Sequence, residues 1–133
     1  MTTRHAACSC GQLKLTCEGE PVRISICHCI ECQKRTGAPF GAQARFPRAK
    51  VAIEGQAKDY VRVAESGHKL TSRFCPVCGS TVYWTIEPAP DLIAVAVGAF
   101  GDPAFPTPNH SVWERTRHAW VTELGRLPME HLP

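Results

Sequence analysis

The chain has 133 residues and a net charge of +3, with 15 basic and 12 acidic side chains spread along it. This length fits one domain, and charges of both signs without a patch favour neither a nucleic-acid surface nor a membrane surface. No apolar run approaches the roughly 18 residues that a membrane helix needs. We therefore expect one domain, residues 1–133, that binds neither nucleic acid nor membrane.

The pattern of the chain predicts many short strands. Ten glycines and eleven prolines are scattered along it, which leaves little room for long helices. Alternation of apolar and polar residues, together with β-branched and aromatic residues, marks the strands. In chain order they are expected at 13–18, 22–26, 40–46, 60–63, 69–74, 81–86 and 92–97. Helix is expected only as one or two turns from about residue 30 to 35, ended by Gly37. The fold class is mainly β with short helical turns.

Seven of the eight cysteines fall into three tight clusters. Thiolates at C-x-C and C-x-x-C spacing can turn toward one tetrahedral centre, at roughly 2.3 Å each, and zinc is the metal that such sulfur sets prefer. The clusters are Cys8 and Cys10, then Cys27, Cys29 and Cys32, then Cys75 and Cys78. Cys17 stands apart, in phase with Leu13 and Leu15, and is predicted to be a small buried core residue.

Two other uses of cysteine fit less well. A disulfide framework would suit a secreted protein, but residues 1–7 (MTTRHAA) contain no apolar export segment, so a reducing cytoplasm is expected. Cysteines two apart are also poor disulfide partners. An iron–sulfur cluster with four thiolates would leave three of the clustered cysteines unused.

The count of seven predicts two unequal zinc sites. Cys8, Cys10, Cys75 and Cys78 suit a closed, structural site that ties the N-terminus to the middle of the chain. The remaining three cysteines lie within six residues and lack a fourth cysteine. Their open position is left for water, a substrate thiol or His28, and an open position is where zinc performs chemistry.

The order of these motifs resembles the glutathione-dependent formaldehyde-activating enzyme family, which includes centromere protein V. The likeness covers nearly the whole chain, through C-x-C, C-H-C-x-x-C, R-F-C-x-x-C-G and a late V-W-E-R-x-R-H-x-W segment. It is carried by Cys8, Cys10, Gly11, Cys27, His28, Cys29, Cys32, Arg35, Gly37, Arg73, Phe74, Cys75, Cys78 and Gly79, and more loosely by His110, Trp113, His118 and Trp120. The resemblance implies a β-tent fold of curved antiparallel sheets. It also implies a structural zinc on the four cysteines, and carbon–sulfur lyase chemistry on a glutathione adduct of formaldehyde at a second zinc on the three.

Such a reaction needs a group that moves protons and groups that hold the substrate. By their pKa, His28, His68 and His110 are the candidates for proton transfer. Because glutathione carries two carboxylates, Lys34 and Arg35 beside the three cysteines are candidates for binding it.

Several other side chains suggest further roles. Arg73 is a candidate donor to a cysteine sulfur of the closed site. The three tryptophans are expected in the core or an interface. The Pro-rich stretch 99–109, with an exposed-looking Phe100 and Phe105, suggests a cover for the open zinc or the contact of a homodimer.

Three functions remain open from the sequence. The first is a zinc-dependent lyase of the S-(hydroxymethyl)glutathione synthase type, acting on a thiol adduct of a small aldehyde. The second is a non-catalytic binding module stabilised by zinc, in which an internal ligand completes the three-cysteine site. The third, redox sensing by the three cysteines, would require thiolates of low pKa without metal.

Overall fold

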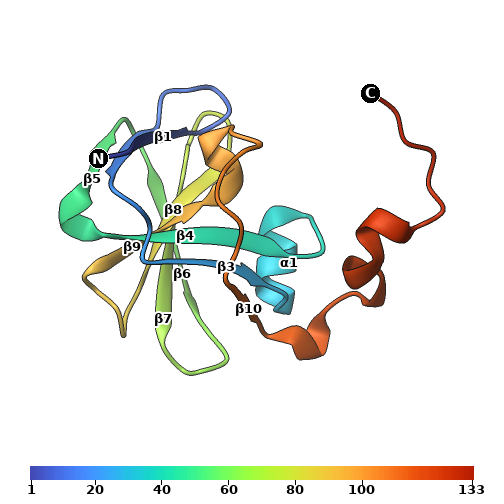
Figure 1. Ribbon diagram of the computed structural model, residues 1–133. Coiled ribbons are helices and arrows are strands. Elements are labelled where there is room, and N and C mark those ends of the chain that lie inside the picture. The colour runs from blue at the N-terminus through green and yellow to red at the C-terminus, as the bar shows by residue number, and fades with distance from the viewer.

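The computed structural model describes residues 1–133 and is mainly β (Figure 1). Its strands are β1 (Thr3–Ala7), β2 (Lys14–Glu18), β3 (Arg23–Cys27), β4 (Gly41–Pro47), β5 (Val51–Glu54), β6 (Lys58–Val63), β7 (Lys69–Phe74), β8 (Thr81–Ile86), β9 (Leu92–Ala96) and β10 (His110–Val112). The single α-helix is α1 (Ile30–Thr36), and short 3₁₀ segments span Arg48–Lys50, Val97–Phe100, Glu114–Thr116 and Ala119–Arg126. The expected class, many short strands with helical turns, is confirmed.

The strands form two open sheets. The smaller has the order β1-β2-β5 and the larger the order β10-β3-β4-β9-β8-β7-β6. Neighbouring strands are antiparallel, except that β10 runs parallel to β3 and pairs Val112 with Cys27. All seven expected strands are present. The sequence analysis missed β1, β5 and β10, because each is short and carries little apolar alternation.

Helix α1 begins and ends as the sequence indicated. Cys29 caps its N-terminus, where the Sγ atom accepts a hydrogen bond from the backbone N–H of Cys32 at 3.3 Å. Gly37 ends it in the left-handed conformation, with φ of 67°, and its N–H bonds the carbonyl of Gln33. The helix packs against β4.

The core lies between the two sheets. The smaller sheet contributes Leu15 and Cys17, and the larger one contributes Phe46, which is fully buried. Burial of a side chain of that size stabilises the fold by about 2–3 kcal/mol. The buried phase of residues 13, 15 and 17 matches the predicted alternation, so Cys17 is confirmed as a core residue.

The two aromatic rings after β9, which looked exposed in the sequence, are partly buried. Phe100 stacks on Phe105 with ring centroids 4.6 Å apart and also contacts Phe46 at 6.1 Å. Both rings pack on the core cluster. Phe46 and Phe100 are distant in the sequence, so no local pattern reveals their contact. The homodimer stays a prediction.

The C-terminal residues extend away from the two sheets. After β10 the chain passes α1 and continues through the 3₁₀ segment Ala119–Arg126 to a terminus well outside the sheets (Figure 1). Trp120 and Leu124 on this segment are each about 40% exposed. No helix in the protein has the length and apolar character needed to cross a membrane.

Candidate metal centres and the adjoining cleft

The first cysteine group joins two turns that are far apart in the sequence. Cys8 and Cys10 lie in the turn between β1 and β2, and Cys75 and Cys78 lie in the turn between β7 and β8. All four sulfur atoms lie within 4.8 Å of one another. The Sγ atom of Cys10 is 3.6 Å from that of Cys8 and 3.7 Å from that of Cys75. Sulfurs at roughly 2.3 Å from a tetrahedral zinc would be about 3.8 Å apart, so these residues fit that ion.

Glycines allow both turns to close. Gly11 and Gly79 have φ angles of 84° and 81°, in the left-handed region that side chains disfavour. The N–H of Gly11 bonds the carbonyl of Cys8 at 3.0 Å, and that of Gly79 bonds the carbonyl of Cys75 at 2.8 Å. Each glycine thus folds the chain back so that two cysteines face one centre.

Hydrogen bonds to sulfur support this group. The side-chain amide of Gln12 donates to Cys75 Sγ at 2.9 Å, and the backbone N–H of Leu13 donates to Cys8 Sγ at 3.3 Å. Hydrogen bonding with Ser80 lowers the pKa of Cys78 to about 5, which favours the thiolate that a metal requires. Gln12 was not anticipated. Arg73, expected as a donor, instead forms an ion pair with Asp59 at 2.8 Å.

The second cysteine group, which we call the triplet, surrounds the start of α1. Cys27 ends β3, Cys29 caps the helix and Cys32 lies in its first turn. The three sulfurs lie within 4.8 Å of one another. Cys27 is buried, whereas Cys29 and Cys32 are partly exposed. Hydrogen bonding from Cys27 lowers the pKa of Cys32 to about 5, with a further contribution from the Arg35 cation.

The C-terminal part of the domain braces the triplet loop. The N–H of His28 bonds the carbonyl of Val112 at 3.0 Å, and the hydroxyl of Thr116 donates to the carbonyl of His28 at 2.7 Å. The side-chain amide of Gln33 donates to the carbonyls of both His28 and Thr116 at 2.9 Å. Sequence reasoning missed this brace because it depends on tertiary contacts of residues more than 80 positions away.

A strained residue joins the brace to the triplet. Trp113 directly follows the residue paired with Cys27, and it is the one non-glycine residue with a positive φ, 57°. A bulky side chain in this region costs free energy, and such strain is concentrated at functional sites. The indole is 38% exposed, and the Arg115 guanidinium lies 4.8 Å from its centroid.

The three candidate histidines differ in burial. His28 is almost fully buried, and its Nε2 atom lies 3.1 Å from Ser111 Oγ. Burial lowers the pKa of His28, with a further lowering by the Arg117 cation, so the ring is neutral near pH 7. His68 and His110 are exposed, and His110 Nδ1 lies 2.8 Å from Asn109 Oδ1. Neither cysteine group includes a histidine nitrogen.

Arg35 connects the triplet to a cleft. Its guanidinium lies over the ring of the buried Trp84, with Cζ 4.1 Å from the centroid. It also contacts Gly41 so closely that a Cβ atom there would lie 2.8 Å from a guanidinium nitrogen. Any side chain at position 41 would therefore displace Arg35.

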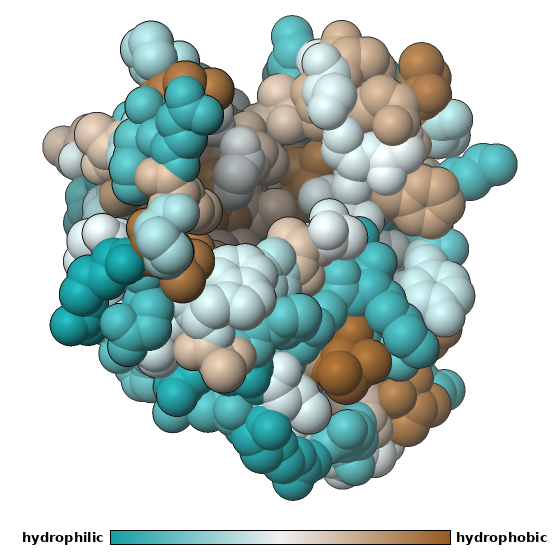
Figure 2. Space-filling view, turned by 90° about the vertical axis from the view of Figure 1, so that its right-hand side faces the viewer, coloured by the Kyte–Doolittle hydropathy of each residue, from teal (hydrophilic) through white to brown (hydrophobic).

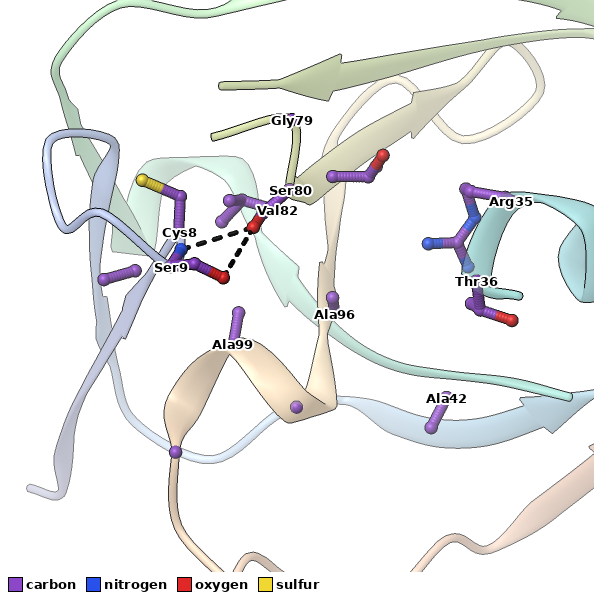
Figure 3. Close-up of a pocket in the computed structure, with 14 residues that line it drawn as sticks. Cys8, Ser9, Arg35, Thr36, Ala42, Gly79, Ser80, Val82, Ala96 and Ala99 are labelled. Carbon is purple, nitrogen blue, oxygen red and sulfur yellow. Dashed lines mark hydrogen bonds between the residues drawn. The ribbon is translucent and has the colours of Figure 1, made fainter. Parts of the chain in front are cut away.

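Two hollows meet at Arg35. The larger, of about 650 Å³, extends to Cys8 and Ser9, and Figure 3 shows the guanidinium pointing into it from the helix. Two hydrogen bonds between Ser9 and Ser80, at 3.0 and 3.2 Å, lie at its far end. The smaller, of about 450 Å³, lies between α1 and strands β6 and β7 and is lined by Lys34. Arg35 and Thr81 line both hollows, which therefore adjoin, and together we call them the cleft. The face that carries α1 is visibly hollowed (Figure 2).

Comparison with known proteins identifies a family and a similar fold. The family described as glutathione-dependent formaldehyde-activating enzyme matches residues 3–116. The chain therefore belongs to this family, as its motifs indicated. A crystal structure of a Rhodobacter sphaeroides protein is similar with a TM-score of 0.62 and 17% sequence identity, covering 80% of this chain and 98% of that one. At this identity the likeness concerns the fold.

Proposed function

We propose that the protein is a zinc-dependent carbon–sulfur lyase that forms or cleaves the adduct of a thiol, glutathione or a similar one, with formaldehyde or another small aldehyde. The observation that carries the proposal is the different number of sulfurs in the two cysteine groups, four in one and three in the other. Four sulfurs fit a closed site, whereas the triplet offers three sulfurs with neither a fourth cysteine nor a histidine nitrogen among them. Family membership supports the same substrate class.

We assign one zinc to each group, structural at the four cysteines and catalytic at the triplet. The fold is proposed to be of the β-tent type that the family resemblance implies. Because both groups need thiolates, a reducing compartment such as the cytoplasm suits the protein.

In the proposed reaction a sulfur–carbon bond forms between the thiol and the aldehyde carbon, and the thiol proton ends on the aldehyde oxygen. A zinc ion with an open position lowers the pKa of a thiol that binds there. The chain holds the substrate through the cations of Lys34 and Arg35, which line the cleft beside the triplet.

The proton transfer is proposed for a histidine. Of the three candidates, His28 has the most support, because it lies within the triplet loop and is neutral and therefore able to accept a proton. Its Nδ1 atom is buried without a hydrogen-bond partner, so it has an unused acceptor or donor position. His68 and His110 are retained as solvent-exposed carriers that would exchange the proton with bulk water.

A binding module without catalysis is the second candidate, and one observation favours it. Neither hollow of the cleft is lined by a cysteine of the triplet, so a substrate in the cleft would reach the sulfurs only past Arg35. In that case the triplet would serve, like the four-cysteine group, to stabilise the fold.

Metal analysis with cobalt substitution separates the two candidates. The lyase proposal expects two metals per chain and a change in the cobalt–thiolate absorption when glutathione is added. The Cys29→Ala variant should bind one metal and lose the glutathione response. Two metals whose spectrum ignores every thiol tested, together with no turnover of glutathione and formaldehyde, would support the binding module instead.

A further inference from the structure

The smaller hollow of the cleft is rich in positive charge. Three cations line it: Lys34 and Arg35 from α1, and Arg62 from β6, 27 residues further along the chain than Arg35. Glu31 is the one carboxylate among its lining residues. The lining therefore carries a net charge of +2 near pH 7, three cations less one carboxylate. Cations gathered in a cavity repel one another, and the repulsion is relieved when an anion binds among them.

The cations of this hollow form no ion pair with a carboxylate. Lys34, Arg35, Arg62 and Glu31 take part in none of the five ion pairs, which join Arg4, Arg73, Arg115, Arg117 and Arg126 to carboxylates elsewhere. The neighbouring strand offers a comparison, because Arg73 on β7 does have a carboxylate partner, Asp59 on β6. Lys34 and Arg62 are thus available for a ligand, whereas Arg35 already interacts with Cys32.

Polar groups beside Arg62 complete the lining. Ser72 on β7 is only 5% exposed and faces the hollow together with Tyr60 on β6. The register pairs Tyr60 with Ser72, so the two hydroxyls and Arg62 lie on one face of the sheet. A guanidinium flanked by hydroxyl donors is suited to hold a carboxylate through two parallel hydrogen bonds.

The smaller hollow and the triplet share helix α1. Lys34 and Arg35 belong to the helix that Cys29 caps and that contains Cys32. A ligand with its thiol at the triplet would therefore extend along α1 toward β6.

We propose that this hollow binds a carboxylate of the thiol substrate, and that Arg62 determines the preference for acidic thiols over neutral ones. That the bound thiol is a substrate rests on the lyase proposal. The carboxylate site itself does not depend on that activity. Arg62 is remote in sequence from every cysteine cluster, and it acts by holding the substrate rather than by touching the reacting atoms.

Binding of a thiol-blocked ligand tests the site without catalysis. S-methylglutathione cannot give a thiolate to the metal, so its affinity for the zinc-loaded protein, measured by calorimetry, reports the carboxylate contacts. We expect Arg62→Gln to weaken binding about tenfold, as the loss of a charged hydrogen bond does. The dimethyl ester of S-methylglutathione should bind weakly to both proteins. Arg126→Gln, the same change on the exposed C-terminal segment, serves as control and should bind like the parent protein.

Steady-state kinetics gives the second readout. Arg62→Gln should raise KM for glutathione with kcat unchanged, and leave KM for the neutral thiol 2-mercaptoethanol unaltered. Equal affinity of parent and Arg62→Gln for S-methylglutathione, or an equal rise of KM for both thiols, overturns the carboxylate site. Binding that depends on Arg62 in a protein without turnover upholds the site and refutes the lyase proposal, so the two failures are distinguishable.

Discussion

The guanidinium of Arg35 is held against the indole of Trp84, with Cζ 4.1 Å from the ring centroid. Trp84 is fixed in turn, because its Nε1–H donates to the side-chain oxygen of Gln43 at 2.8 Å, and the amide nitrogen of Gln43 donates to Ser25 Oγ at 3.1 Å. All three of these partners are buried. A row of contacts across β3, β4 and β8 thus sets the position of the cation between the triplet and the cleft.

A double-mutant cycle measures this contact. Arg35→Gln and Trp84→Leu should each destabilise the protein, and the double variant should lose less than the sum of the two. A cation–π contact that is partly shielded from water predicts a coupling of about 1 kcal/mol. Urea unfolding of the zinc-loaded protein gives the three free energies of unfolding. Additive losses would mean that the two side chains are neighbours without an energetic link.

The two cysteine groups should respond differently to loss of a ligand. Cys75→Ala removes a sulfur that joins turns 65 positions apart, so we expect loss of the cooperative unfolding transition and of solubility. Cys29→Ala removes a ligand contained in a six-residue loop and should leave a folded protein without lyase activity. Circular dichroism, zinc content and activity of both variants provide the measurement. Equal unfolding of both variants contradicts this division of roles.

The strain at Trp113 can be measured by comparing two substitutions that both remove the indole. Glycine adopts a φ of 57° without penalty, whereas alanine does not, so Trp113→Gly should be more stable than Trp113→Ala by about 1 kcal/mol. Thermal and urea unfolding give the difference. Ordinarily glycine destabilises relative to alanine, so the opposite order would show that the backbone relaxes out of the left-handed region.

Because the thiol of Cys17 is buried, we expect the free energy of unfolding to depend on pH in the alkaline range. Burial raises the pKa of its thiol from 9.0 to about 11. The unfolded chain therefore releases this proton at a lower pH than the folded chain does. Below pH 9 the thiol is protonated in both states, and the free energy of unfolding then falls as pH rises from 9 to 11.

A variant isolates the contribution of this thiol. The advantage of the parent protein over Cys17→Ala should shrink by at most about 2 to 3 kcal/mol across that interval, since one pKa unit corresponds to about 1.4 kcal/mol. Urea unfolding at several pH values gives the difference, and the subtraction cancels the groups that titrate in both proteins. A constant difference from pH 8 to 11 argues against a thiol that stays neutral in the core.

Local patterns in the sequence predict much of the fold. Alternation placed Leu13, Leu15 and Cys17 in the core, and Gly37 marked the end of α1, because both signals act between residues close in the chain. Spacing grouped the cysteines into the two sets whose sulfurs lie together.

What escaped prediction depends on distant contacts. Strand β10 has three residues, and its parallel partner β3 lies more than 80 positions earlier, so no local pattern reveals it. Gln12 resembles any surface glutamine until the fold brings Cys75 beside it. Phe100 and Phe105 look exposed in a Pro-rich stretch and prove to be packed on the core. The composition of a segment does not show which distant residues its side chains contact.

The parallel pairing of β10 with β3 has a consequence for synthesis on the ribosome. The four-cysteine group is complete once residue 78 has emerged, whereas the brace of the triplet awaits Val112 and Thr116. The N-terminal part of a chain emerges and folds first during translation. The triplet therefore acquires its final shape only after residue 116 has emerged, long after its own cysteines have become available.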